Sequence, residues 1–135
     1  MICLSFTACN SDSEINLQDS LKTEEKEPAR NEESKNLEKL YAEIIAFSGN
    51  SKPCTDNKNW AYTTIGVNSC GQPSQYIIYS KTIDVPQFLA KVNAYTEKQI
   101  EFNKKWYPAN ETLTCAPLAI PILVDCVDGK ATLIL

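Results

Sequence analysis

The chain has 135 residues, which is room for one domain, and its formal net charge at pH 7 is −4. The charge lies between Asn10 and Asn36, where eight acidic residues outnumber four basic ones, while the rest of the chain carries nine of each. A neutral domain argues against nucleic acid as a partner and against attraction to an anionic membrane surface, because both require a cationic footprint.

The N-terminus carries a targeting pattern. Residues 1–8 (MICLSFTA) are apolar, and Phe6-Thr7-Ala8-Cys9 resembles the lipobox of bacterial lipoproteins, in which a small residue precedes a cysteine that is cleaved and acylated. The resemblance implies that residues 1–8 are the remnant of a signal peptide that extends upstream, and that Cys9 is the lipidation site. A diacylated cysteine would hold the chain to a membrane without a spanning helix.

The segment behind Cys9 is acidic. Ser11-Asp12-Ser13-Glu14 is similar to the stretch that follows the acylated cysteine in surface-exported lipoproteins of Bacteroidetes, which implies the outer membrane or the cell surface as its location. Residues 9–36 are charged and contain no aromatic residue, so they cannot bury enough apolar surface to offset the entropy of ordering. We interpret them as a flexible acidic tether, with an ordinary disordered extension as the alternative.

Residues 37–45 predict an amphipathic helix. Its apolar stripe consists of Leu37, Leu40, Tyr41, Ile44 and Ile45. Ser34 or Asn36 can cap the start, and Gly49 stands where a left-handed C-terminal cap belongs.

The sequence then predicts two strands, over residues 60–65 and 75–80, joined by a sharp turn. The second strand is apolar on both faces, which predicts that both faces are covered.

A second, longer helix begins after Asp84, its expected N-cap, with Pro86 in the first turn and Gln87 as the capping-box partner. Pro108 is expected to end it. At the C-terminus, Asp128-Gly129 between two apolar runs predicts a type I′ hairpin. The elements of residues 37–135 together predict an α+β fold, in which a small, mostly antiparallel sheet packs on one long and one shorter helix.

Four cysteines, Cys54, Cys70, Cys115 and Cys126, predict two disulfides in an oxidising compartment, since a domain of about a hundred residues gains little from core burial alone. The chain contains neither histidine nor a CxxC pair, so no metal site and no other cofactor is predicted. Three pairings are open; we favour Cys54–Cys70 and Cys115–Cys126, each closing a short loop. The pairing is crossed if the segment after Cys115 does not bend back.

Catalysis is not predicted. Without histidine no general base is available to a serine or cysteine nucleophile, and the cysteines are expected to be oxidised. The carboxylate pairs Asp125 with Asp128 and Glu97 with Glu101 lie beside a tight turn and on an exposed helix face. We interpret both pairs as solvated surface groups.

Two features are candidates for binding. Four aromatic residues, Trp60, Tyr62, Tyr76 and Tyr79, could form a platform for sugars or peptide side chains, with core filling as the alternative. Residues 116–121 (APLAIP), between two half-cystines, resemble the reactive loops of small secreted peptidase inhibitors.

The pattern W…G…CG.P..YI.YS…D…F…Y…FN, followed by two further cysteines, resembles small Cys-containing lipoproteins of Bacteroidetes over residues 54–135. We therefore expect a lipoprotein of the bacterial cell envelope, held to the membrane through lipid on Cys9. Its non-catalytic domain is expected to bind a protein, peptide or glycan. The alternative is a small secreted peptidase inhibitor that uses the Cys115–Cys126 loop.

Overall fold

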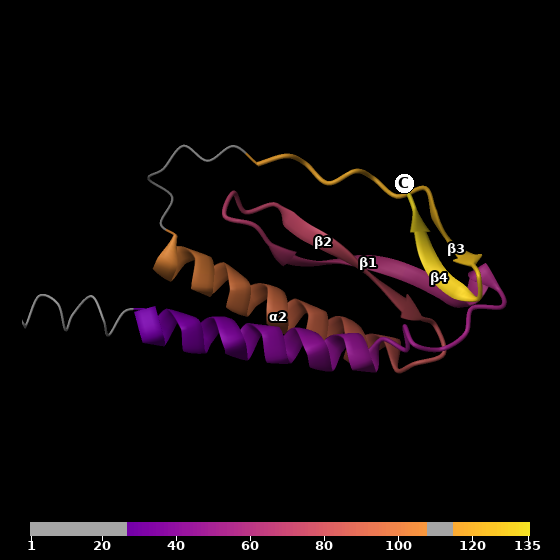
Figure 1. Ribbon diagram of the computed structural model, residues 1–135, viewed down its shortest axis with the longest axis horizontal. Helices are drawn as coiled ribbons and strands as arrows, with labels where there is room; N and C mark the ends of the chain where they lie inside the picture. The colour runs from indigo at the N-terminus through magenta and orange to yellow at the C-terminus, as the bar shows by residue number, and fades with distance from the viewer. Residues whose placement is uncertain (1–26, 108–114) are drawn as a thin grey trace, which may run out of the picture. The chain divides into compact units, whose positions relative to one another are not determined.

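The computed structural model describes residues 27–107 and 115–135. A helix over residues 27–47 comes first, followed by the short 3-10 helix η1 (Asn57–Asn59). The strands are β1 (Trp60–Val67), β2 (Pro73–Ser80), β3 (Leu123–Val127) and β4 (Lys130–Ile134), and helix α2 (Val85–Trp106) lies between β2 and β3. The predicted α+β fold is confirmed, with one difference: the strands form two separate antiparallel hairpins, β1–β2 and β3–β4, in place of one sheet (Figure 1).

The first helix is longer than predicted. The chain divides into the units Met1–Lys35 and Asn36–Leu135, and residues 27–47 are helical. Residues 27–36, which the sequence analysis assigned to the tether, are helical, so neither Ser34 nor Asn36 caps the start. These residues are mostly good helix formers such as Glu, Ala, Arg and Lys, which favour a helix without an apolar stripe. The helix ends as predicted, with Gly49 at φ +73°.

The β1–β2 hairpin packs one face against the two helices. Alternate residues of each strand point to this face, which places Ile65 and Ile77 in a buried core. The same core contains Phe88, Val92 and Tyr95 of α2 and Ile44 of the first helix. Asp84 starts α2 as predicted: its Oδ1 accepts a hydrogen bond from the backbone N–H of Gln87 at 3.2 Å.

The opposite face of the β1–β2 hairpin is covered by the β3–β4 hairpin. Cys54, Trp60 and Val124 form a second buried cluster there, against which Ile78 and Leu133 pack. The prediction that both faces of β2 are covered is therefore confirmed at Ile77 and only in part on this face, where Tyr76 and Ile78 are half-buried. The turn between β3 and β4 is also as predicted, because Asp128 and Gly129 both adopt positive φ angles, of 52° and 75°.

The favoured disulfide pairing is wrong. The bonds are Cys54–Cys126 and Cys70–Cys115, with Cα–Cα distances of 5.3 and 6.3 Å. The β3–β4 hairpin folds back over the β1–β2 hairpin, which brings Cys126 to the loop that precedes β1. The backbone N–H of Cys54 donates to the carbonyl of Gly129 at 2.8 Å, so the hairpin turn is held beside the bond. Each disulfide therefore links segments far apart in the sequence.

Candidate functional site

The four aromatic residues named from the sequence do not form one platform. Trp60 is 6% exposed and lies under the β3–β4 hairpin. Tyr79 points to the opposite face of the sheet, where its ring lies 4.8 Å from that of Phe88. Tyr62 and Tyr76 remain as a half-buried edge-to-face pair, with ring centroids 5.6 Å apart. The odd spacing between Tyr76 and Tyr79 is the sequence signal that separates them, since side chains alternate along a strand.

The carboxylate pairs lie as interpreted, on the surface. Asp125, Asp128, Glu97 and Glu101 are all exposed, and Asp125 Oδ1 accepts a hydrogen bond from the backbone N–H of Cys126. Among residues 27–107 and 115–135, no three carboxylate or cysteine side chains are gathered as metal ligands. Cys9 and the acidic stretch behind it lie outside the described residues, and the described helices include none that is long and apolar enough to cross a bilayer.

Two tyrosines in the core have perturbed acidities. Burial raises the pKa of Tyr41, and it raises the pKa of Tyr95, where the neighbouring Tyr41 and the negative charge of Glu38 act in the same direction. Their rings are 5.7 Å apart, and Tyr95 is only 8% exposed. Both belong to the packing between the helices, so burial in the core accounts for the raised pKa values.

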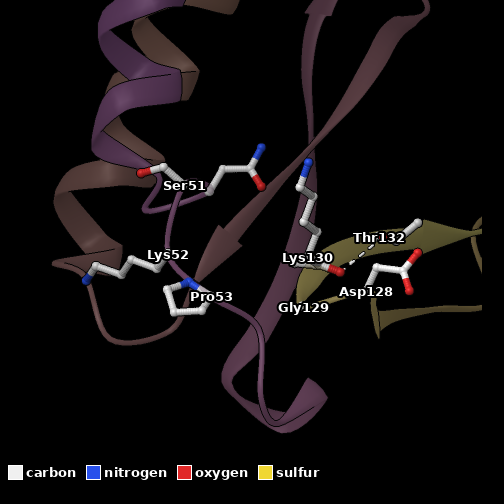
Figure 2. A pocket seen from close by; sticks show the side chains of 9 residues that line it. Ser51, Lys52, Pro53, Asp128, Gly129, Lys130 and Thr132 are labelled. Atoms are coloured by element: carbon white, nitrogen blue, oxygen red, sulfur yellow. Dashed lines mark hydrogen bonds between the residues drawn. The ribbon is translucent and has the colours of Figure 1, made fainter.

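A polar pocket that was not predicted from the sequence lies beside the β3–β4 turn (Figure 2). Its volume is about 630 Å³, and it is formed by residues 50–53 and residues 128–132. Figure 2 shows Lys52 pointing away from Lys130 and Asp128; its Nζ donates to Thr82 Oγ1 at 3.4 Å. Amide, hydroxyl and charged groups line an open surface here, which suits a small polar ligand. Sequence alone gave no signal for it, because the two walls meet only when the hairpin folds back.

The most distinctive surface is the segment after Cys115. Its exposure repeats every three residues: Cys115 and Leu118 are half-buried and Pro121 and Val124 are buried, while the two residues between each of these are exposed. A repeat of three with two prolines is typical of a polyproline II strand, which has three residues per turn. We call the outward residues the apolar ridge: Ala116, Pro117, Ala119, Ile120, Ile122 and Leu123.

The apolar ridge contains no polar side chain. Ile120 is 84% exposed and Ile122 is 71% exposed, and Leu135 beside them is 68% exposed. At about 3.1 Å per residue the ridge extends for roughly 22 Å. In the described residues after Cys115, the first backbone hydrogen bond is the one that Ile122 N–H donates to the carbonyl of Ile134, at 2.7 Å. Within the described chain, residues 116–121 make no backbone hydrogen bond of their own to the hairpins or helices.

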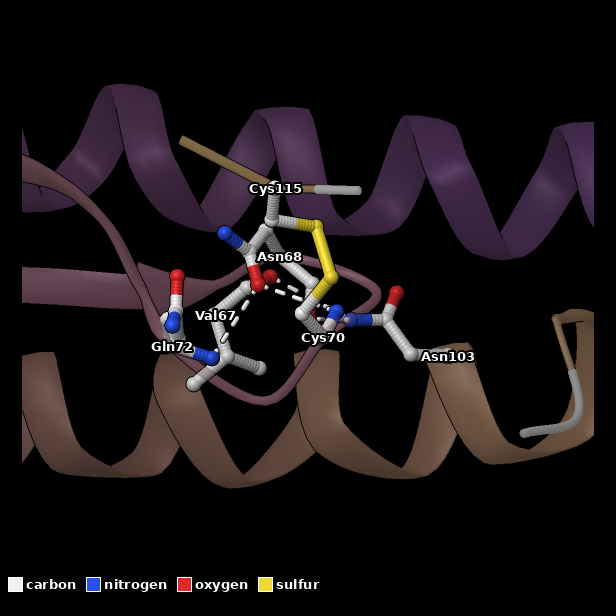
Figure 3. The surroundings of a disulfide bond; sticks show 6 residues. All are labelled: Val67, Asn68, Cys70, Gln72, Asn103 and Cys115. Carbon is white, nitrogen blue, oxygen red and sulfur yellow. Dashed lines mark hydrogen bonds between the residues drawn. A yellow bond between two sulfur atoms is a disulfide. The ribbon is translucent and has the colours of Figure 1, made fainter. Parts of the chain in front are cut away.

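Each end of the segment is fixed. Cys115 is bonded to Cys70 in the β1–β2 turn (Figure 3), and Pro121 is buried where β3 begins. From the sequence, residues 116–121 were expected to lie in a loop closed by a bond between Cys115 and Cys126. The structure places the same residues between two different disulfides, and they remain a constrained, exposed strand.

Comparisons of the chain with protein-family models, with curated proteins and with solved structures find no match.

Proposed function

We propose that the protein is a lipid-anchored, non-enzymatic lipoprotein of the bacterial cell envelope whose domain binds another protein through the apolar ridge. Cys9 in its lipobox-like context supplies the anchor, and the acidic residues behind it lead to the domain at the outer membrane or cell surface. Two disulfides between distant segments support an oxidising compartment, because such bonds persist outside the cytosol.

The exposure of the apolar ridge is the observation that carries the binding proposal. Exposed apolar side chains gathered in one patch mark interaction sites on soluble domains. The ridge is also ordered in advance, since two prolines and two disulfides limit its freedom, so binding costs little conformational entropy. Its three-residue repeat fits a partner with an aromatic-lined groove, in which ring side chains pack on proline and isoleucine.

Site-specific photocrosslinking on cells tests this surface. A photoreactive residue at position 120 is expected to capture a distinct partner protein, and Pro117→Gly should reduce that yield by loosening the strand. The matched control is the same residue at position 127, because Val127 is 44% exposed but lies outside the ridge. Equal capture from both positions, capture of a second copy of the chain alone, or no capture from position 120 would refute the ridge as the binding surface.

The anchor has a separate test. Cells grown with a palmitate analogue should label the wild-type chain, and Cys9→Ser should abolish the label. Cys3→Ser serves as the matched control and should leave the labelling intact, because Cys3 is expected to leave with the signal segment. Label that persists in Cys9→Ser would overturn the anchor.

A peptidase inhibitor is the second candidate function, and the two fixed ends of residues 116–120 favour it. A constrained, exposed strand can occupy a peptidase cleft without being released after cleavage. The purified chain, incubated with a panel of serine and cysteine peptidases, should then inhibit at least one of them. If no peptidase is inhibited and residues 116–120 are cut freely, this candidate is excluded.

A further inference from the structure

The two disulfides differ in their access to solvent. Cys54 is 4% exposed and is packed with Trp60 and Val124, so the Cys54–Cys126 bond lies against a buried cluster. Cys70 is exposed on the β1–β2 turn, and its partner Cys115 is half-buried. A reductant must bring a thiolate onto one of the two sulfur atoms, so the bond on the turn is the accessible one.

The turn that carries Cys70 is held without the disulfide (Figure 3). Asn68 Oδ1 accepts hydrogen bonds from the backbone N–H groups of Cys70 and Gln72, both at 3.0 Å. Asn103 Nδ2 on α2 donates to the carbonyls of Val67 and Asn68, both at 3.2 Å. None of these hydrogen bonds involves the sulfur of Cys70.

Two further bonds join the end of β1 to α2. The N–H of Gly66 donates to Thr96 Oγ1 at 3.0 Å, and the N–H of Val67 donates to Gln99 Oε1 at 2.7 Å. The end of β1 and the turn that carries Cys70 are therefore held to α2 by side-chain hydrogen bonds. On the other side, the first backbone hydrogen bond of the described chain after Cys115 is that of Ile122. In the described part of the chain, the disulfide is the covalent constraint on residues 116–120 at the Cys115 end.

We propose that the Cys70–Cys115 disulfide is a redox-controlled clasp that sets whether the apolar ridge is held as a strand or released, a regulation that rests on the proposed binding role of the ridge. A dithiol reductant opens it in two steps. One thiolate attacks Cys70 Sγ, forming a mixed disulfide, and Cys115 leaves as a thiolate and takes up a proton. The second thiol of the reductant then displaces Cys70, which is protonated in turn. Two electrons and two protons pass to the protein, and the reductant is left as a disulfide.

Reductive titration of the full chain tests the clasp without any ligand. The oxidised protein is equilibrated with increasing dithiothreitol, free thiols are alkylated, and the remaining disulfides are then reduced and alkylated with an isotopically different reagent. Mass spectrometry should find Cys70 and Cys115 labelled together at a reductant concentration at least about tenfold below that needed for Cys54 and Cys126. Simultaneous opening of both bonds, or earlier opening of Cys54–Cys126, would overturn the proposal.

Limited proteolysis and hydrogen exchange of the selectively reduced protein supply the second measurement. Proteolytic cleavage within residues 116–120 should become faster, while the amides of Gly66, Val67 and Gln72 keep their protection. Loss of protection at those amides would contradict a fixed turn. The double variant Cys70→Ser/Cys115→Ser should behave like the reduced form, and Cys54→Ser/Cys126→Ser is the matched control that retains the clasp. These readouts do not require a partner, so their failure is distinct from failure of the crosslinking test.

Discussion

Asn103 on α2 donates from Nδ2 to the carbonyl oxygen of Val67, 36 residues earlier in the chain, at 3.2 Å. The same group donates to the carbonyl of Asn68, so one side chain serves two acceptors at the end of β1. Asn103→Ala should lower the free energy of unfolding by about 1–3 kcal/mol, because both carbonyls lose their partner. Urea unfolding measures this. The exposed Asn93→Ala on the same helix is the control, and an equal loss in both variants would contradict the assigned role.

Gly66 is expected to be the glycine least tolerant of substitution. Its φ is +72°, and an added Cβ would meet the side chain of Gln99, lie 2.7 Å from Ser74 Oγ and lie 3.3 Å from a ring carbon of Tyr95. Gly66→Ala therefore combines backbone strain with crowding, which together cost about 2–5 kcal/mol.

A substitution at Gly71 separates backbone strain from crowding. Its φ is +79°, but an added Cβ there meets nothing within 4 Å. Gly71→Ala should lower the free energy of unfolding by only about 1–2 kcal/mol, from strain alone. Thermal or urea unfolding of Gly66→Ala and Gly71→Ala, measured side by side, distinguishes strain from crowding. Equal losses in the free energy of unfolding would show that crowding at Gly66 contributes nothing.

Asp84 should stabilise α2 through its cap. Asp84→Ala removes the acceptor for the N–H of Gln87 and should lower the free energy of unfolding by about 1 kcal/mol. Asp84→Asn keeps an acceptor oxygen and should lose much less. Asp56→Ala, which removes a similar cap from the three-residue η1, is expected to have a smaller effect than Asp84→Ala. Calorimetric melting temperatures of the three variants check this order.

Tyr95 should make stability depend on alkaline pH. Burial raises its pKa in the folded state above the ordinary value of 10.0. Its contribution to stability is therefore complete below pH 10, and it declines as pH rises through the folded-state pKa, because the unfolded chain releases the proton first. Between pH 9 and pH 11, the urea midpoint of unfolding should fall further in the wild type than in Tyr95→Phe. An equal fall in the two proteins would contradict the raised pKa of Tyr95.

The local elements could be predicted from the sequence because their signals are local. The cap at Asp84 and the turn at Asp128-Gly129 each depend on residues within four positions of one another, and both are confirmed. The start of the first helix was missed for the opposite reason. Residues 27–36 have helix-forming composition but no apolar stripe, and the prediction of the helix depended on the stripe.

The disulfide pairing and the candidate surface could not be predicted. Both depend on the way the β3–β4 hairpin folds back over β1–β2, and no local signal specifies that contact. A preference for short loops led to Cys54–Cys70, whereas the Cys54–Cys126 bond has a sequence separation of 72. The apolar ridge was singled out only as residues 116–121, because its three-residue repeat of exposure becomes visible when Pro121 and Val124 are buried.

The nested arrangement of the disulfides also determines how the protein would respond to a pulling force. The Cys54–Cys126 bond encloses the Cys70–Cys115 bond, whose sequence separation is 45. Tension applied between the N-terminal residues and the C-terminal strand β4 would pass directly from Cys54 to Cys126 through covalent bonds. The β1–β2 hairpin and α2 would carry none of the load, and only the chain outside this link could lengthen. Such a force would therefore act on the first helix, which contributes Ile44 to the core, and would leave the β1–β2 hairpin and α2 unloaded.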